Sequence, residues 1–152
     1  MKVGILAGGV GSRLSEETKV KPKPMVEIGG HPILWHILMH YAGYGYKDFT
    51  IALGYKGEQI KKYMLDYRER NCHMKVNLGT GEVERDQEHQ PDWVVELVET
   101  GVSTNTGGRI KRLAPYMGDE TFMLTWGDGV ADVDLDKLLE FHRSHGKLAT
   151  LT

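Results

Sequence analysis

The sequence predicts an α/β fold built on a mostly parallel sheet. Short apolar runs alternate with segments whose apolar residues recur at helical spacing, which is the pattern of βα units. A glycine-rich stretch, Gly8 to Gly11, follows the first apolar run directly. With 152 residues, 40% of them hydrophobic, the chain can bury one core, so we expect one domain over residues 1–152.

The first strand is predicted at Lys2 to Ala7. Gly8 to Pro24 carry glycine, charge and proline instead of periodicity, which predicts a long loop. The following apolar periodicity indicates a helix with Pro32 as its first residue, ended by Gly43 and Gly45.

A second βα unit follows. Phe49 to Leu53 reads as a strand, Gly54 to Gly57 as a turn, and the next amphipathic helix extends to about Arg70. Met74 to Leu78 is predicted as a third strand. The charged stretch Gly79 to Asp92 is expected to be a solvated excursion.

The last third of the chain repeats the alternation. A strand is predicted at Trp93 to Glu99, a polar loop at Thr100 to Thr106, and a helix from Gly107 to Met117 with Gly118 as its stop. Thr121 to Trp126 has the composition of a buried strand.

Asp134 is predicted to cap a final helix that begins at Leu135. Ala149 to Thr152 have strand composition, so we expect a strand that has just begun and a sheet that continues beyond this sequence. The domain is therefore expected to be truncated at its C-terminus.

Charge and hydropathy point to a small ligand. The 21 acidic residues nearly balance the 19 basic ones, and neither sign forms a long block, which argues against nucleic acid or a membrane surface as a partner. Met1 to Ala7 are unlike a signal sequence and no stretch approaches the length of a membrane span, so we expect a cytoplasmic protein. Cys72 is the only cysteine, and we expect an ordinary thiol.

The glycine stretch suits phosphate binding, because glycines let backbone N–H groups approach an anion together. A dinucleotide fingerprint would need glycine where Leu14 stands, and a P-loop would need a Gly-Lys-Ser/Thr triplet that the sequence lacks. A second cationic segment, Lys21 to Pro24, follows. Its prolines predict an extended backbone in which one of the two lysines, Lys21 or Lys23, faces a phosphate while the other faces solvent.

These motifs resemble the sugar-phosphate nucleotidyltransferases. The resemblance is carried by Leu-Ala-Gly-Gly-x-Gly-x-Arg-Leu with its spaced Lys-Pro, by Thr106 to Arg112 and by Gly127 to Asp132, so it covers essentially the whole chain. Ser12 stands where threonine is usual. The resemblance implies a Rossmann-like sheet with helices on both faces, a sugar-binding portion missing here, and homo-oligomers of the full-length protein.

Within this family the chain looks most like the members that join CTP to glucose 1-phosphate, giving CDP-glucose for deoxysugars of lipopolysaccharide and O-antigen. By this resemblance, the nucleotide is lined by Leu6, Ala7, Gly8, Gly9, Val10, Gly11 and Ser12. Arg13 is expected to stabilise the leaving pyrophosphate and Lys23 to bridge the reacting phosphates, both as catalytic residues.

Asp128 follows a buried strand between two glycines, which leaves room for a metal at the carboxyl edge of the sheet. It is expected to be a catalytic Mg²⁺ ligand, with a second aspartate from beyond residue 152 as implied by the resemblance. The alternative is a turn-forming aspartate.

The loop before the third helix is expected to read the base through Thr104 and Arg109, by resemblance. For Arg109 the alternative is a solvent-exposed charge in the first helical turn. The histidine pairs His36/His40 and His142/His145 lack the partners of a zinc site, so packing and surface roles are expected. UTP or dTTP in place of CTP, and a non-catalytic nucleotide-binding module, remain open alternatives.

Overall fold

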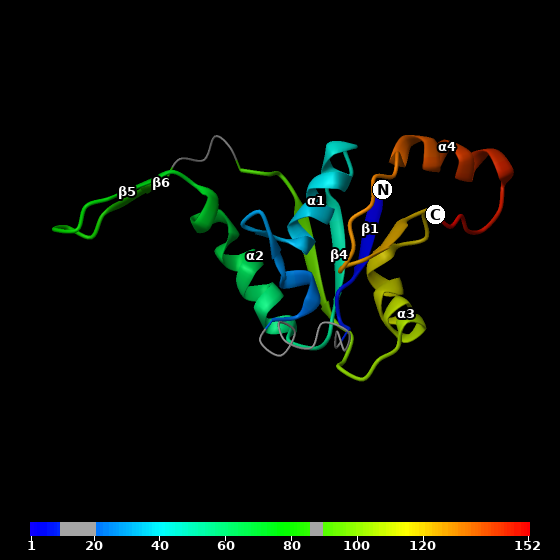
Figure 1. Cartoon of the computed structure of the whole chain (residues 1–152), viewed down its shortest axis with the longest axis horizontal. Helices are drawn as coiled ribbons and strands as arrows, with labels where there is room; N and C mark the ends of the chain where they lie inside the picture. Colours follow the sequence, from blue (N-terminus) through cyan, green and yellow to red (C-terminus); the bar gives the residue numbers. More distant parts are fainter. Residues whose placement is uncertain (10–20, 86–89) are drawn as a thin grey trace.

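In the part of the chain that the structure describes, the central sheet has four parallel strands with β1 between two of them. The structure is a computed structural model that describes residues 1–9, 21–85 and 90–152. The strands are β1 (Lys2–Leu6), β4 (Asp48–Leu53), β7 (Val94–Glu99) and β8 (Met123–Trp126), in the order β7-β4-β1-β8 (Figure 1). The chain moves from β1 toward one edge and then returns to add β8 on the other side of β1. This reversal makes the carboxyl ends of β1 and β8 the place where such sheets bind ligands.

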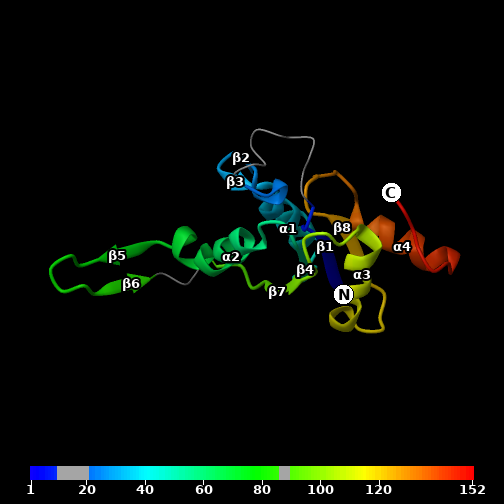
Figure 2. The same cartoon turned by 90° about the horizontal axis from the view of Figure 1, so that it is seen from below.

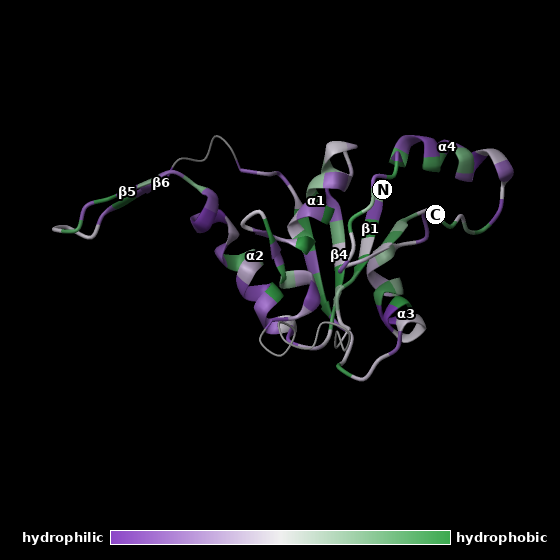
Figure 3. Ribbon diagram, viewed as in Figure 1, coloured by the Kyte–Doolittle hydropathy of each residue, from purple (hydrophilic) through white to green (hydrophobic). Residues whose placement is uncertain are grey.

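Helices cover both faces of the sheet, which confirms the predicted Rossmann-like architecture. On one face, α1 (Ile33–Gly43) and α2 (Gly57–Asn71) pack against alternate side chains of β1 and β4, and the start of α4 (Leu135–His145) joins them. On the other face lies α3 (Thr106–Met117), against the intervening side chains (Figures 1 and 2). The apolar residues concentrate on the strands and on the sheet-facing sides of helices (Figure 3).

Glycine and capping residues in the sequence predicted the helix ends to within one residue. Gly118, with φ of 74°, ends α3 as predicted, and the side chain of Asp134 caps α4 by accepting a hydrogen bond from the backbone N–H of Lys137. Pro32 is the residue before α1 rather than its first residue, and α3 begins one residue earlier than predicted, at Thr106. Differences of one residue are ordinary at helix ends.

A small hairpin, not predicted from the sequence, precedes α1. β2 (Glu27–Ile28) and β3 (His31–Pro32) pair antiparallel around Gly29 and Gly30, whose φ values are 60° and 84°. Positive φ at both central residues suits a tight hairpin turn, and glycine adopts it without steric cost.

The predicted third strand at Met74 to Leu78 does not join the central sheet. Instead, β5 (Met74–Val76) pairs antiparallel with β6 (Val83–Arg85) in a ribbon that extends away from the body of the molecule (Figures 1 and 2). All six residues of the two strands are exposed, because strands this short present no apolar face that the core could bury. Of the stretch expected to be solvated, residues 79–85 and Asp92 are exposed, Gln90 and Pro91 are half-buried, and residues 86–89 lie outside the described part.

The predicted strand at Ala149 to Thr152 is absent from the structure. Leu148 and Leu151 are fully exposed, and Thr150 turns back so that its hydroxyl contacts the rings of His142 and His145 at 2.9 and 2.8 Å. A strand forms only where a neighbour offers backbone partners, and no described segment pairs with these residues. Within the described residues, no helix is long and apolar enough to cross a membrane.

Candidate functional site

A cleft of about 790 Å³ opens at the carboxyl ends of the central strands. Its walls come from the residues after β1, from the loop between β7 and α3, from the end of β8, and from the short 3-10 helix η1 (Lys23–Met25). The lining residues are Leu6, Ala7, Gly8, Gly9, Lys23, Pro24, Val102, Ser103, Thr104, Asn105, Thr106, Arg109, Trp126 and Asp128. This volume lies in the usual range of small-molecule sites.

Lys23 and Asp128 meet at this cleft. Nζ of Lys23 lies 3.0 Å from Oδ2 of Asp128, and the two side chains are 23% and 36% exposed. Lys21 instead pairs with Glu27 at 2.6 Å, so the two lysines serve different surfaces as predicted. The predicted extended backbone is wrong at Lys23, which begins a 3-10 turn because Pro24 at its second position suits a first helical turn.

Asp128 is held at the cleft by the close packing of the residue before it. Gly127 donates its N–H to the Leu6 carbonyl at 3.0 Å, and a Cβ on Gly127 would lie 3.1 Å from Cβ of Ala7. The glycine therefore allows β8 to end directly against β1. Asp128 does stand in a turn, and its carboxylate also faces the cleft.

The carboxylate of Asp128 suits a hard cation. Mg²⁺ is usually bound through one or two carboxylates, with substrate phosphates and water completing its coordination. Among the described residues only Lys23 makes a polar contact with this carboxylate, and no group of three His, Cys, Asp or Glu is placed to hold a metal. One partly exposed aspartate in a wide cleft fits Mg²⁺ carried by a phosphate ligand; its role as a metal ligand stays a prediction.

Arg109 is buried, with 6% exposure, so the alternative of a solvent charge is wrong. Its NH1 group donates to Leu53 O, Thr100 Oγ1 and Gly101 O at 3.1, 2.6 and 2.9 Å. Its NH2 group donates to Gly8 O and Val102 O at 2.8 and 3.2 Å. Desolvation by this burial lowers the pKa of the guanidinium from its ordinary value, and the charge of the neighbouring Arg112 lowers it further.

Thr104 is positioned by a second arginine. NH1 of Arg112 donates to the hydroxyl of Thr104 and to the carbonyl of Thr100. A Cβ on Gly108 would lie 2.8 Å from Cγ2 of Thr104, so glycine there gives the threonine its room. The loop before α3 is thus tied to the helix that follows it, and the sequence analysis did not single out Arg112.

The start of α3 also faces the cleft. Its first residue is Thr106, and the first intrahelical bond runs from the N–H of Arg109 to the carbonyl of Asn105. The preceding N–H groups have no helical partner and can receive an anion or a base carbonyl.

The glycine stretch is described only at its beginning. Gly8 and Gly9 line the cleft together with Leu6 and Ala7, and their contact with a nucleotide stays a prediction. Val10, Gly11, Ser12 and Arg13 lie outside the described residues, so their predicted roles stay predictions.

Trp126 also lines the cleft, and the sequence analysis missed it. It is 58% exposed, and the prediction of a buried strand here is wrong, because the residues of β8 alternate between half-buried and exposed. Its position directly before Gly127 and Asp128 was the available signal, because strand-end residues contribute to such sites.

The histidine pairs have local partners. His36 shares a hydrogen bond with the carbonyl of Ile28 at 2.9 Å, and His142 and His145 both contact Thr150. These contacts agree with packing and surface roles.

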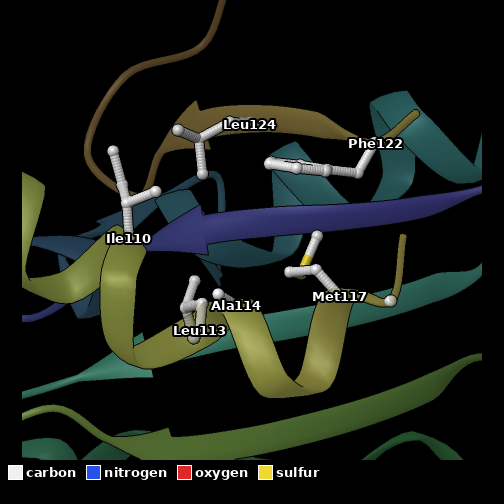
Figure 4. Close-up of a pocket in the computed structure, with 7 residues that line it drawn as sticks. Ile110, Leu113, Ala114, Met117, Phe122 and Leu124 are labelled. Carbon is white, nitrogen blue, oxygen red and sulfur yellow. The ribbon is translucent and has the colours of Figure 1, made fainter. Parts of the chain in front are cut away.

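A second pocket, of about 80 Å³, lies between α3 and β8 (Figure 4). It is lined by Ile110, Leu113, Ala114, Met117, Gly118, Phe122 and Leu124. With no polar side chain in this lining, the pocket is too small and too apolar for a phosphate ligand, and we do not count it as part of the site.

Known proteins with similar sequences are nucleotidyl transferases. The family model for nucleotidyl transferase matches residues 2–152. Glucose-1-phosphate cytidylyltransferase of Salmonella typhimurium is 53% identical over 100% of this chain and 60% of that protein. The probable glucose-1-phosphate cytidylyltransferase of Bacillus subtilis is 48% identical over 100% of this chain and 59% of that protein. The chain thus spans about 60% of the length of these curated relatives.

Solved structures share the fold. HddC from Yersinia pseudotuberculosis aligns with a TM-score of 0.71 and 26% identity over 93% of this chain and 53% of that one. This likeness agrees with the strand order and with helices on both faces of the sheet.

Proposed function

The chain belongs to the nucleotidyl transferase family, and we propose that it forms the nucleotide-binding part of an enzyme that makes CDP-glucose and pyrophosphate from CTP and glucose 1-phosphate. The observation that carries the proposal is the pairing of Lys23 with Asp128 at 3.0 Å in the cleft beside Gly8 and Gly9. The choice of CTP and glucose 1-phosphate is supported by the names of relatives 53% and 48% identical to this chain.

The reaction is an in-line displacement at phosphorus. A phosphate oxygen of glucose 1-phosphate forms a bond to the α-phosphorus of CTP, the bond from that phosphorus to the oxygen bridging to the β-phosphorus breaks, and pyrophosphate leaves with the electron pair. No protein nucleophile is required, so positioning and charge neutralisation dominate.

Each charged residue has a proposed task in this displacement. Lys23 leaves Asp128 and binds the two reacting phosphates, while Arg13 neutralises the departing pyrophosphate. Asp128 would hold Mg²⁺, which neutralises phosphate charge when it is bound. Water and the substrate phosphates would complete the coordination of this ion.

The base is proposed to lie against the loop between β7 and α3. Thr104 can offer a hydroxyl, and the free N–H groups at the start of α3 can meet a pyrimidine carbonyl. Few contacts of this kind decide between pyrimidines, so UTP or dTTP is the runner-up substrate.

The proposal is tested by measuring nucleotide binding and turnover separately. Calorimetry with Mg²⁺ and CTP, UTP or dTTP gives the preferred nucleotide, and pyrophosphate release with glucose 1-phosphate gives turnover. We expect the tightest binding for CTP. A preference for UTP or dTTP would favour the runner-up. Binding without turnover would favour a non-catalytic module, and no binding of any triphosphate would contradict the proposal.

A further inference from the structure

The buried guanidinium of Arg109 is unusual in having no carboxylate partner. None of the ion pairs among the described residues includes it. A buried cation is costly unless its N–H groups are hydrogen-bonded. NH1 and NH2 together carry four N–H bonds and meet five oxygen acceptors, so carbonyls and one hydroxyl satisfy these two nitrogens.

The acceptors belong to three different strand ends. Gly8 follows β1, Leu53 ends β4, and Thr100, Gly101 and Val102 follow β7. These segments include two walls of the cleft, so one side chain fixes their distance from each other.

Two glycines make room for this guanidinium. A Cβ on Gly8 would lie 2.1 Å from NH1 of Arg109, and its three nearest atoms would all belong to that side chain. A Cβ on Gly54 would lie 2.5 Å from the same nitrogen. Neither glycine has positive φ, so backbone conformation does not explain them. Among residues 1–9, 21–85 and 90–152, nothing lies within 4 Å of the Cβ position of Gly9, the next residue along.

We propose that Arg109 is a positioning residue that holds Gly8, directly after β1, against the loop after β7, so that both face one nucleotide. The inference rests on the proposed function, because it explains how two walls of the cleft are held in position for the nucleotide. The effect of Arg109 on the nucleotide passes through the Gly8 carbonyl and through the loop from Thr100 to Val102. The positive charge of Arg109, which no carboxylate among the described residues neutralises, also favours an anionic ligand in the cleft.

The glycine pair supplies a matched test of packing. In Gly8→Ala the new methyl group displaces the guanidinium, whereas in Gly9→Ala it meets no atom of the part of the chain that the structure describes. We expect Gly8→Ala to lower the midpoint of thermal unfolding and to speed exchange of the amides of Tyr55 and Thr100, which donate to Gly8 O and Leu53 O at 3.2 and 3.0 Å. Gly9→Ala should leave both measurements unchanged. Equal effects of the two variants would overturn the packing argument.

Substitution of Arg109 tests its influence on the nucleotide. Arg109→Lys keeps the charge and some donors, whereas Arg109→Met removes both. The probe is CTP with Mg²⁺, measured by calorimetry on the whole chain well below its unfolding midpoint. We expect about tenfold weaker binding or more for Arg109→Met, with partial recovery for Arg109→Lys. Amide exchange should rise at Tyr55 and Thr100 and stay unchanged at Leu38 in α1.

The outcomes separate the two proposals. Unchanged CTP affinity in Arg109→Met overturns the positioning role. Weaker binding with unchanged exchange at Tyr55 and Thr100 also overturns it, because Arg109 would then act by direct contact. If Arg109→Met does not fold, the Gly8→Ala variant decides by the same two readouts. Absence of CTP binding by the unaltered chain would instead contradict the proposed function, and the exchange measurements would still test whether Arg109 fixes the loops.

Discussion

The ammonium nitrogen of Lys23 lies 3.0 Å from Oδ2 of Asp128, and it joins segments 105 residues apart in the chain. In this pair the two charges neutralise each other, whereas in the proposed reaction Lys23 binds phosphate and Asp128 binds Mg²⁺. A triphosphate would give Lys23 a phosphate to bind and would free the carboxylate for a metal ion. Metal and nucleotide should therefore bind cooperatively.

Replacing Lys23 by methionine should separate these two effects. The variant loses a charge-assisted hydrogen bond to phosphate, so the affinity for CTP with Mg²⁺ should fall about tenfold or more. Mg²⁺ alone should bind more tightly, because the cation that competes for Asp128 is gone. Calorimetry measures both. Lys21→Met is the matched control, since Lys21 pairs with Glu27, and an equal loss in both variants would contradict the assignment.

Replacing Asp128 by asparagine should abolish the contribution of Mg²⁺ to nucleotide binding. The side chain keeps its size but loses the charge that a hard cation requires. Titrations of CTP with Mg²⁺ and with a chelator should then give equal affinities. Unfolding should change little, because partly exposed ion pairs contribute about 0–1 kcal/mol. Asp132→Asn is the control, and a surviving magnesium effect in Asp128→Asn would refute the metal site.

The two glycines beside Asp128 should respond differently to alanine. A Cβ on Gly127 would lie 3.1 Å from both Cβ of Ala7 and the carbonyl oxygen of Leu6, while a Cβ on Gly129 would meet no atom among the residues that the structure describes. Because β1 is buried and cannot move away, Gly127→Ala should destabilise the protein by about 1–3 kcal/mol. Denaturant unfolding of both variants tests this, and Gly129→Ala should match the unaltered chain. Similar stabilities for all three proteins would show that β1 and β8 can separate at no cost.

The cap of α4 should make stability depend on pH at both extremes. The pKa of Asp134 is lowered, first by the side-chain hydrogen bond from Lys137, and the pKa of Lys137 is raised by the same bond. The contribution of Asp134 is therefore present above its unfolded pKa, near 3.8, and is lost as pH falls through the lowered folded value. The contribution of Lys137 is present below its unfolded pKa, near 10.5, and is lost as pH rises through the raised folded value.

Asp134→Ala should lower the midpoint of thermal unfolding at neutral pH, because it removes both the cap and this pair. Asp134→Asn keeps an acceptor for the N–H of Lys137. Its midpoint of thermal unfolding should therefore lie between those of Asp134→Ala and the unaltered chain. The difference between Asp134→Asn and the unaltered chain should shrink below pH 3.8. A difference that is constant from acid to neutral pH would exclude a role for the charge.

Local signals in the sequence predicted most of the fold and the position of the cleft. Gly118 ends α3 through its own backbone conformation, and Asp134 caps α4 through a side-chain hydrogen bond to a residue three positions later. Both helix ends could be predicted because each depends on only a few neighbouring residues. Gly8 and Asp128 were predicted near each other because parallel strands place their carboxyl ends on one edge. The resemblance then supplied the chemistry of the cleft.

What the sequence could not predict depends on contacts between distant residues. Arg109 has the local pattern of an exposed first-turn arginine, and its burial arises from acceptors as far away as Gly8. Met74 to Val76 have strand composition, but their partner was not predictable from their own residues. Trp126 was counted as part of a buried strand, although the edge position of β8 leaves it 58% exposed.

The close fit of Gly8 and Gly54 around Arg109 also has an evolutionary consequence. A side chain at position 8 or 54 is excluded mainly by the residue at position 109 and, for position 54, by the Gly8 carbonyl as well. Across related chains, the three positions should therefore vary together, with alanine tolerated at position 8 where position 109 holds a shorter side chain. Conservation of Gly8 would then be explained by the packing of Arg109 against it as much as by the binding of a phosphate.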